Sequence, residues 1–168
     1  PALHAKVIIS LARAYYRKGS VVYDDLLKLL EDGVQFCSEN GLKDIQTEMY
    51  NIFGLVYQNR GEFIKSLHYF ENVAKQENNI YRKFKTITDI IHLFALSGKF
   101  VKAMEYLGEA ELIFSDYPAV FFKRRLIRVA GLIKFECGDY EDAIIKFNEF
   151  IQFNINNNNT TYLLWFHL

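Results

Sequence analysis

The feature that most constrains this chain is a short pattern that recurs four times around a glycine. In the clearest copy, Gly138 is followed by an aromatic residue at Tyr140, a small residue at Ala143 and a large apolar residue at Phe147. The same order begins at positions 61 and 98, and a copy with two extra turn residues begins at position 19. The four glycines are therefore separated by steps of 42, 37 and 40 residues. Self-similarity at such a period is typical of a stacked array of structural repeats.

The spacing within each copy predicts two helices joined by a tight turn. Glycine adopts a left-handed backbone conformation without a Cβ clash, so it suits the residue just past a helix end. The small residue indicates where two antiparallel helices cross closely, since a larger side chain would push their axes apart. Seven residues before the four glycines lie Ala12, Gly54, Ile91 and Gly131, and three of these are also small. We therefore predict an all-α fold, a solenoid of about four helix-turn-helix repeats plus a C-terminal partial helix.

Further patterns place the boundaries of these repeats. The predicted repeats span about 3–40, 43–79, 81–116 and 118–154. The expected core face of the first helix consists of Leu3, Val7, Leu11, Ala14 and Tyr15. Pro118 is expected in the first turn of a helix. Residues 155–161 form an asparagine-rich stretch, expected with Asn154 to be a mobile loop, and the apolar residues 162–168 would start a further helix. We expect residues 1–168 to be a single domain cut from a longer protein.

The repeat also resembles a known family over nearly the whole chain. Two copies carry apolar and small residues at the signature offsets of the tetratricopeptide repeat: Tyr50, Phe53, Gly54, Tyr57, Gly61, Phe63, Ser66 and Phe70, then Ile127, Ala130, Gly131, Gly138, Tyr140, Ala143 and Phe147. The resemblance implies a right-handed α-α superhelix. Ile91 and Lys134 depart from the pattern, and the steps exceed the usual length of about 34 residues. The chain thus resembles long-helix variants such as kinesin light chains, spindle-orientation scaffolds and peptide-sensing bacterial regulators. It also resembles the helical-repeat part of proteasome-lid and COP9-signalosome subunits.

Composition and motifs argue against several other classes. Lys plus Arg and Asp plus Glu both number 20, which gives no reason to expect a nucleic-acid or membrane partner. The four histidines share no metal-ligand spacing, and Cys37 and Cys137 form no metal or redox motif, so we expect them to be core thiols. The sequence has no glycine-rich phosphate loop and no nucleophile elbow. We therefore expect no catalytic residue, cofactor or metal, and a cytoplasmic location.

A candidate binding surface follows from the family resemblance. In that family the first helix of each repeat lines a concave groove through four positions. In this chain the sixteen groove positions hold seven positive and two negative residues. These positions are Lys6, Ile9, Arg13, Arg17, Glu48, Asn51, Leu55, Asn59, Lys85, Thr88, His92, Leu96, Arg125, Arg128, Leu132 and Glu136. The expected partner-binding residues are Arg13, Arg17, Asn51, Asn59, Lys85, His92, Arg125 and Arg128. Such a surface would attract an acidic peptide or helix. The alternative is a merely solvated helix face.

The sequence thus predicts a scaffold or adaptor that binds another protein in the groove. One alternative is a structural subunit of a large assembly similar to the proteasome lid, and another is the sensor half of a signalling regulator. Self-association through a truncated C-terminal end is also expected, because core surface at the end of an array would otherwise meet water.

Overall fold

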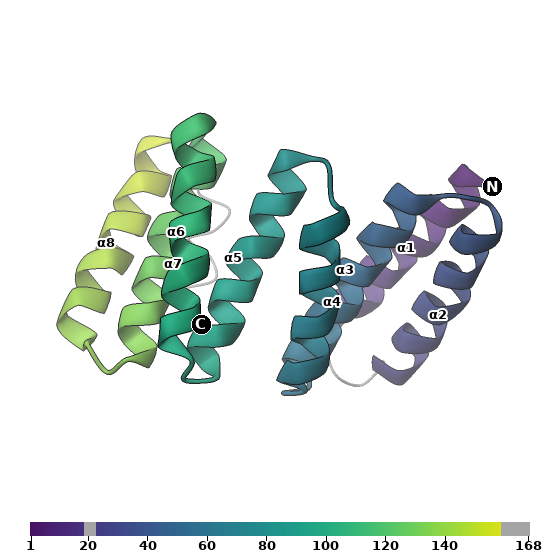
Figure 1. The fold of residues 1–168 in the computed structure, drawn as a ribbon, viewed down its shortest axis with the longest axis horizontal. Coiled ribbons are helices and arrows are strands. Elements are labelled where there is room, and N and C mark those ends of the chain that lie inside the picture. The colour runs from purple at the N-terminus through teal and green to yellow at the C-terminus, as the bar shows by residue number, and fades with distance from the viewer. Residues whose placement is uncertain (19–22, 159–168) are drawn as a thin grey trace. The chain divides into compact units, whose positions relative to one another are not determined.

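The computed structural model describes residues 1–18 and 23–158 (Figure 1). Within these ranges the secondary structure is entirely helical, without a strand, as the sequence predicts. The helices are α1 (Ala2–Lys18), α2 (Tyr23–Glu39), α3 (Lys43–Asn59), α4 (Phe63–Gln76), α5 (Ile80–Leu96), α6 (Phe100–Asp116), α7 (Val120–Glu136) and α8 (Tyr140–Asn156). Several helices that follow one another in sequence pack together, namely α1 with α2, α2 with α3, α3 with α4, α6 with α7 and α7 with α8. This arrangement is that of a helical repeat protein.

The chain divides into two compact units within α5. The first unit is Pro1–Thr86 and contains α1 to α4 with the beginning of α5. The second unit is Ile87–Leu168 and contains the rest of α5 with α6, α7 and α8.

The predicted turn glycines end their helices in the expected way. The backbone φ angles of Gly61, Gly98 and Gly138 are +73°, +69° and +82°, a region that glycine reaches without steric cost. The residue after each glycine donates its N–H back to the preceding helix, for example Lys99 to the carbonyl of Phe94 at 2.9 Å. The prediction for these three turns is confirmed, whereas the turn at Gly19 lies outside the described residues.

Small residues mark the predicted close crossings between paired helices. Ser66 is fully buried on α4, and its Oγ donates to the carbonyl of Gly54 on α3 at 2.7 Å. A Cβ atom at Gly54 would lie 2.4 Å from Cε1 of Phe70, so any larger residue here would force the buried ring to move. In the second unit Ala143 is 1% exposed, and a Cβ atom at Gly131 would lie 2.8 Å from Cε1 of Phe147. The prediction of close crossings is confirmed at both pairs.

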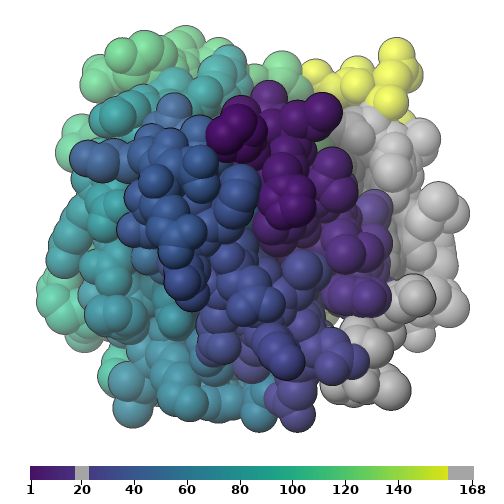
Figure 2. All heavy atoms as spheres, turned by 90° about the vertical axis from the view of Figure 1, so that its right-hand side faces the viewer, coloured from purple at the N-terminus to yellow at the C-terminus, as the bar shows by residue number. Residues whose placement is uncertain are grey.

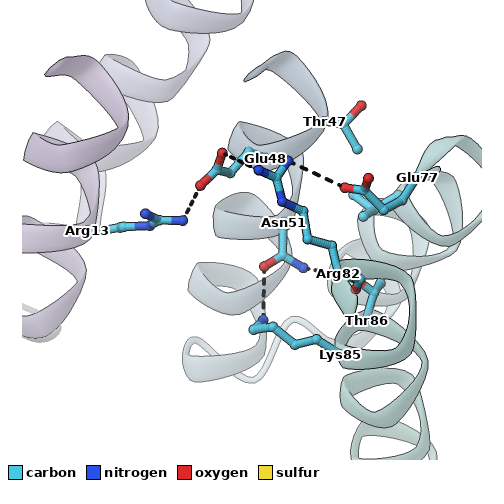
Figure 3. A pocket seen from close by; sticks show the side chains of 9 residues that line it. Arg13, Thr47, Glu48, Asn51, Glu77, Arg82, Lys85 and Thr86 are labelled. Atoms are coloured by element: carbon cyan, nitrogen blue, oxygen red, sulfur yellow. Dashed lines mark hydrogen bonds and ion pairs between the residues drawn. The ribbon is translucent and has the colours of Figure 1, made fainter. Parts of the chain in front are cut away.

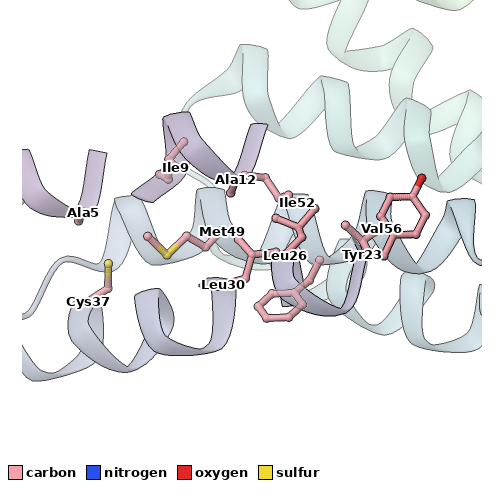
Figure 4. Close-up of a cluster of buried hydrophobic side chains, with 11 residues drawn as sticks. Ala5, Ile9, Ala12, Tyr23, Leu26, Leu30, Cys37, Met49, Ile52 and Val56 are labelled. Atoms are coloured by element: carbon pink, nitrogen blue, oxygen red, sulfur yellow. The ribbon is translucent and has the colours of Figure 1, made fainter. Parts of the chain in front are cut away.

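The core of the first unit corrects the predicted face of α1. Its buried residues are Ala5, Ile9, Ala12, Tyr23, Leu26, Leu30, Cys37, Met49, Ile52, Phe53 and Val56 (Figure 4). Leu3, Val7 and Leu11 were expected there, but they are 78%, 57% and 43% exposed. Two positions along a helix correspond to about 200° of rotation, so the row that starts at Leu3 faces away from the row that starts at Ala5. The surface at the α1 end of this unit is visible in Figure 2.

The structure also corrects several predicted helix boundaries and the predicted burial of one cysteine. The N–H of Ala119 donates to the carbonyl of Tyr117 at 2.8 Å, and this tight turn delays the start of α7 until Val120, so Pro118 precedes the helix. Residues 154–156 were expected in a loop but belong to α8, where Asn154 is buried and its Nδ2 donates to the carbonyl of Phe150 at 2.7 Å. Cys37 is a buried thiol as predicted, whereas Cys137 is exposed at the C-cap of α7. Residues 159–161 of the asparagine-rich stretch and the predicted helix at 162–168 lie outside the described residues.

Candidate functional site

The first unit holds a polar cleft where side chains from α1, α3, α4 and α5 converge (Figure 3). Its volume is about 90 Å³, and its lining residues are Arg13, Thr47, Glu48, Asn51, Val73, Glu77, Arg82, Lys85 and Thr86. We call this set the polar cleft. Three of the expected partner-binding residues meet here, namely Arg13, Asn51 and Lys85, together with Glu48 from the other groove positions.

Glu48 is at the centre of the charged side of the polar cleft. It forms an ion pair with Arg13 on α1, and its other oxygen lies 3.9 Å from a guanidinium nitrogen of Arg82 on α5. Arg82 in turn lies 3.9 Å from Glu77. The Arg13 and Arg82 side chains are 56% and 49% exposed, whereas that of Glu48 is 20% exposed. The cleft thus presents accessible cations around a more enclosed carboxylate.

Asn51 lies one turn after Glu48 on α3 and bridges α3 to α5. Its Oδ1 accepts a hydrogen bond from Lys85 Nζ at 3.1 Å, and its Nδ2 donates to Thr86 Oγ1 at 3.3 Å. The amide therefore uses both a donor and its acceptor within the chain, which fixes its orientation.

Two other expected groove residues lie apart from the polar cleft. Asn59, at the end of α3, donates to the hydroxyls of Tyr16 and Tyr23 at 3.1 and 3.0 Å and so ties α3 to α1 and α2. Arg17 lines a separate hollow on α1 of about 460 Å³, together with Ser10, Arg13 and Tyr16. Ile9, which the family positions placed in the groove, is instead a core residue and is 4% exposed.

The second unit gathers the remaining expected residues around the second half of α5. Arg125 on α7 donates to Asp89 Oδ1 and to Thr88 Oγ1, both at 2.6 Å. The side chains of Arg125 and Asp89 are only 15% and 11% exposed, so this ion pair is part of the packing between α5 and α7. Arg125 therefore stabilises the fold in addition to any role at a surface.

His92 lies in the electrostatic field of this ion pair. Its pKa is lowered to about 4 by burial and by the neighbouring charges of Arg128 and Arg125, while Asp89 acts in the opposite direction. The imidazole is therefore neutral at pH 7, and His92 does not contribute the positive charge that the sequence assigned to it. Arg13 and Arg125 are also paired with carboxylates, so the excess of positive charge is smaller than the position count indicates.

Sequence reasoning missed five lining residues of the polar cleft, namely Thr47, Val73, Glu77, Arg82 and Thr86. The family resemblance points to certain positions along the first helix of each repeat, and these residues are not at those positions. A signal was present, because Asn79 accepts hydrogen bonds from the N–H groups of Tyr81 and Arg82 at 3.1 and 3.2 Å. Asparagine is a strong helix N-cap, so this signal fixes the start of α5 at Ile80, one residue before the predicted boundary, but it does not identify the lining residues.

Residues 1–18 and 23–158 contain no group of three or more histidines, cysteines or acidic residues placed to hold a metal ion. No helix in that part of the chain has the length and apolarity that a transmembrane span requires.

Comparison with known proteins links the chain to a bacterial regulator. No protein-family model matches the chain. The chain is 28% identical over 135 residues to the regulatory protein RapG of Bacillus subtilis (strain 168). That alignment covers 77% of this chain, but the chain spans only 37% of the length of RapG. The all-helical repeat fold and this similarity to a regulatory protein fit a tetratricopeptide-type family.

Proposed function

We propose that this chain is the protein-binding, helical-repeat part of a regulatory protein, and that its polar cleft receives an acidic segment of the partner. The observation that carries the proposal is the convergence of α1, α3 and α5 side chains on one cleft. Its charged lining residues are three cations, Arg13, Arg82 and Lys85, and two carboxylates, Glu48 and Glu77. A solvated helix face would not require residues from three helices to meet.

The existing ion pairs are compatible with binding a further carboxylate. Arg13 and Arg82 are about half exposed, and exposed ion pairs contribute only about 0–1 kcal/mol. A partner carboxylate can therefore replace or share these contacts at small cost. Asn51 and Lys85, which a hydrogen bond holds in a fixed geometry beside these ion pairs, would orient the incoming segment.

The similarity to RapG favours a regulator over a subunit of a large assembly. RapG is a regulatory protein and is much longer than the aligned part, so a role as one half of a signalling regulator agrees with the comparison. In that arrangement the helical repeats would bind the signal or the target protein, and the remaining chain would supply a second activity.

Affinity capture with this chain as bait tests the proposal. The wild type is compared with Arg13→Gln/Arg82→Gln, which removes two cations from the polar cleft. A matched control, Lys28→Gln/Lys75→Gln, removes two exposed cations of the same unit outside the cleft. Quantitative mass spectrometry should find a partner that the wild type and the control retain and the cleft variant loses. Equal recovery of every captured protein by all three would contradict the proposed cleft.

A further inference from the structure

A second hollow of the first unit lies between α2 and α4, with α3 as its floor. These three helices are seen in Figure 1. The hollow has a volume of about 630 Å³, within the range of roughly 300–1,000 Å³ of ligand pockets. Its lining residues are Glu31, Val34, Gln35, Ser38, Glu39, Gln46, Tyr50, Phe53 and Tyr69. We call it the aromatic groove, and it shares no residue with the polar cleft.

The aromatic groove is lined by part of a continuous row of aromatic rings. Tyr69 of α4 stacks on Phe53 of α3 with a centroid distance of 4.9 Å and an interplanar angle of 10°. Tyr69 also contacts Tyr57 at 5.6 Å and Tyr50 at 5.9 Å. Phe53 is only 3% exposed, whereas Tyr50 and Tyr69 are half-buried, so the two tyrosines offer ring surface to the groove.

One end of this row already holds a cation from the chain itself. Lys65 Nζ lies 5.2 Å from the centroid of the Tyr57 ring. The electron-rich face of an aromatic ring attracts cations at such a distance. The opposite end of the row, at Tyr50, opens into the groove, and no lysine or arginine lines it.

The charges around the groove complement those of a cation. The only charged lining residues are Glu31 and Glu39, both exposed on α2, and neither forms an ion pair with a cation of the described residues. Glu39 accepts a hydrogen bond from Gln35 at 3.0 Å, which leaves its charge in place. The pKa of Tyr69 is raised mainly by burial, then by Tyr57 and Tyr50, and least by the negative charge of Glu31.

From this combination we propose that the aromatic groove is a second docking surface, which takes a basic segment of a partner protein. An arginine or lysine side chain enters between Glu31 and Glu39 and lies against Tyr50 and Tyr69. The aliphatic stem of such a side chain covers apolar ring surface while its charged group meets the carboxylates. This surface has the opposite charge preference to the polar cleft and is independent of it.

A peptide titration followed by NMR tests this docking surface with the whole chain. The probes are a short acetylated and amidated leucine peptide with two arginines, and the same peptide with glutamine at both positions. The arginine peptide should shift the ring signals of Tyr50 and Tyr69 and bind about three- to tenfold more tightly than the glutamine peptide. Glu31→Gln/Glu39→Gln should remove this difference, and Tyr50→Leu should reduce it.

Control variants separate the groove from general electrostatics. Asp32→Asn/Glu109→Gln removes the same total charge at exposed positions outside the groove and should bind the arginine peptide like the wild type. Arg13→Gln/Arg82→Gln, which alters the polar cleft, should also leave this binding unchanged. Equal binding of both peptides, an equal loss in the Asp32→Asn/Glu109→Gln control, or shifts confined to residues outside the groove would overturn the proposal.

Discussion

At Gly54 the backbone of α3 passes directly against the ring of Phe70, which is completely buried. A methyl group would lie 2.4 and 2.6 Å from two carbons of this ring, and the close-packed core leaves the ring little room to move. Gly54→Ala should therefore lower the free energy of unfolding by about 1–3 kcal/mol through overpacking. Urea denaturation followed by circular dichroism measures this change.

Gly108 provides the matched control, because it is also a helix-interior glycine. A Cβ atom there would meet nothing within 4 Å. Gly108→Ala should raise stability by about 0.5–1 kcal/mol, since alanine loses less backbone entropy in a helix. A Gly54→Ala variant as stable as Gly108→Ala would contradict the close crossing of α3 and α4.

His92 makes the stability of the second unit depend on pH. In the unfolded chain histidine binds a proton as the pH falls through about 6.5, whereas folded His92 remains neutral until about pH 4. The unfolded state therefore gains protons first, and the free energy of unfolding should fall between pH 6.5 and 4, by up to about 3 kcal/mol. Above pH 6.5 this contribution is fully present.

Thermal melts between pH 7 and 4 test this contribution with two variants. His92→Gln should show a shallower loss of stability with falling pH than the wild type. His68→Gln, which changes an exposed histidine on α4, should retain the wild-type slope. Identical slopes for His92→Gln and the wild type would show that burial and the charges of Arg128 and Arg125 do not lower the pKa of His92 as described.

At the scale of the helix, two substitutions in α1 can show which of its faces packs on α2 and α3. Ile9 is 4% exposed and lies within the core, so Ile9→Ala should cost about 2–4 kcal/mol through lost burial and a new cavity. Val7 is 57% exposed, and Val7→Ala should change stability by no more than about 0.5 kcal/mol. Denaturant unfolding of the two variants distinguishes the faces, and the reverse order would contradict the observed orientation of α1.

The helix ends were predictable from sequence because their signal is local. The ability of glycine to adopt a positive φ angle depends only on its own backbone. The turns at Gly61, Gly98 and Gly138 could therefore be predicted from the glycine alone. Which face of α1 is buried depends on how closely the side chains of α2 and α3 can approach it. Ala5 and Ala12 are buried because their small side chains permit close approach, while larger residues such as Leu3 remain outside. Hydrophobicity alone favoured the wrong row.

The candidate site was predictable only in part, because a count of charged positions does not show which distant residues form ion pairs with one another. The sequence identified Arg13, Asn51 and Lys85, and the structure brings these three into one cleft. It could not show that Glu48 lies beside Arg13, or that Asp89 neutralises Arg125 in a partly buried pair. Lys134 is similar: it occupies an expected aromatic position, yet it joins the end of α7 to Asp139 and Asp142 at the start of α8.

At the scale of the whole molecule, a chain of zero net charge separates its charges between surfaces. Within the first unit the polar cleft has one more cation than it has carboxylates, whereas the charged residues of the aromatic groove are both acidic. Opposite preferences on one unit permit two different partner segments to be distinguished, because placing like charges together is unfavourable. Such discrimination suits the proposed role in regulation.

The most direct test of the account is a calorimetric titration of the captured partner into the wild type, Arg13→Gln/Arg82→Gln and Lys28→Gln/Lys75→Gln, each at low and physiological salt. If the polar cleft receives an acidic segment, the cleft variant should bind about tenfold more weakly than the wild type at low salt, and the control should match the wild type. Wild-type affinity should also fall as salt rises, since ions screen exposed charges. Equal affinity of the cleft variant and the wild type at both salt concentrations would contradict the proposal that this cleft binds the partner.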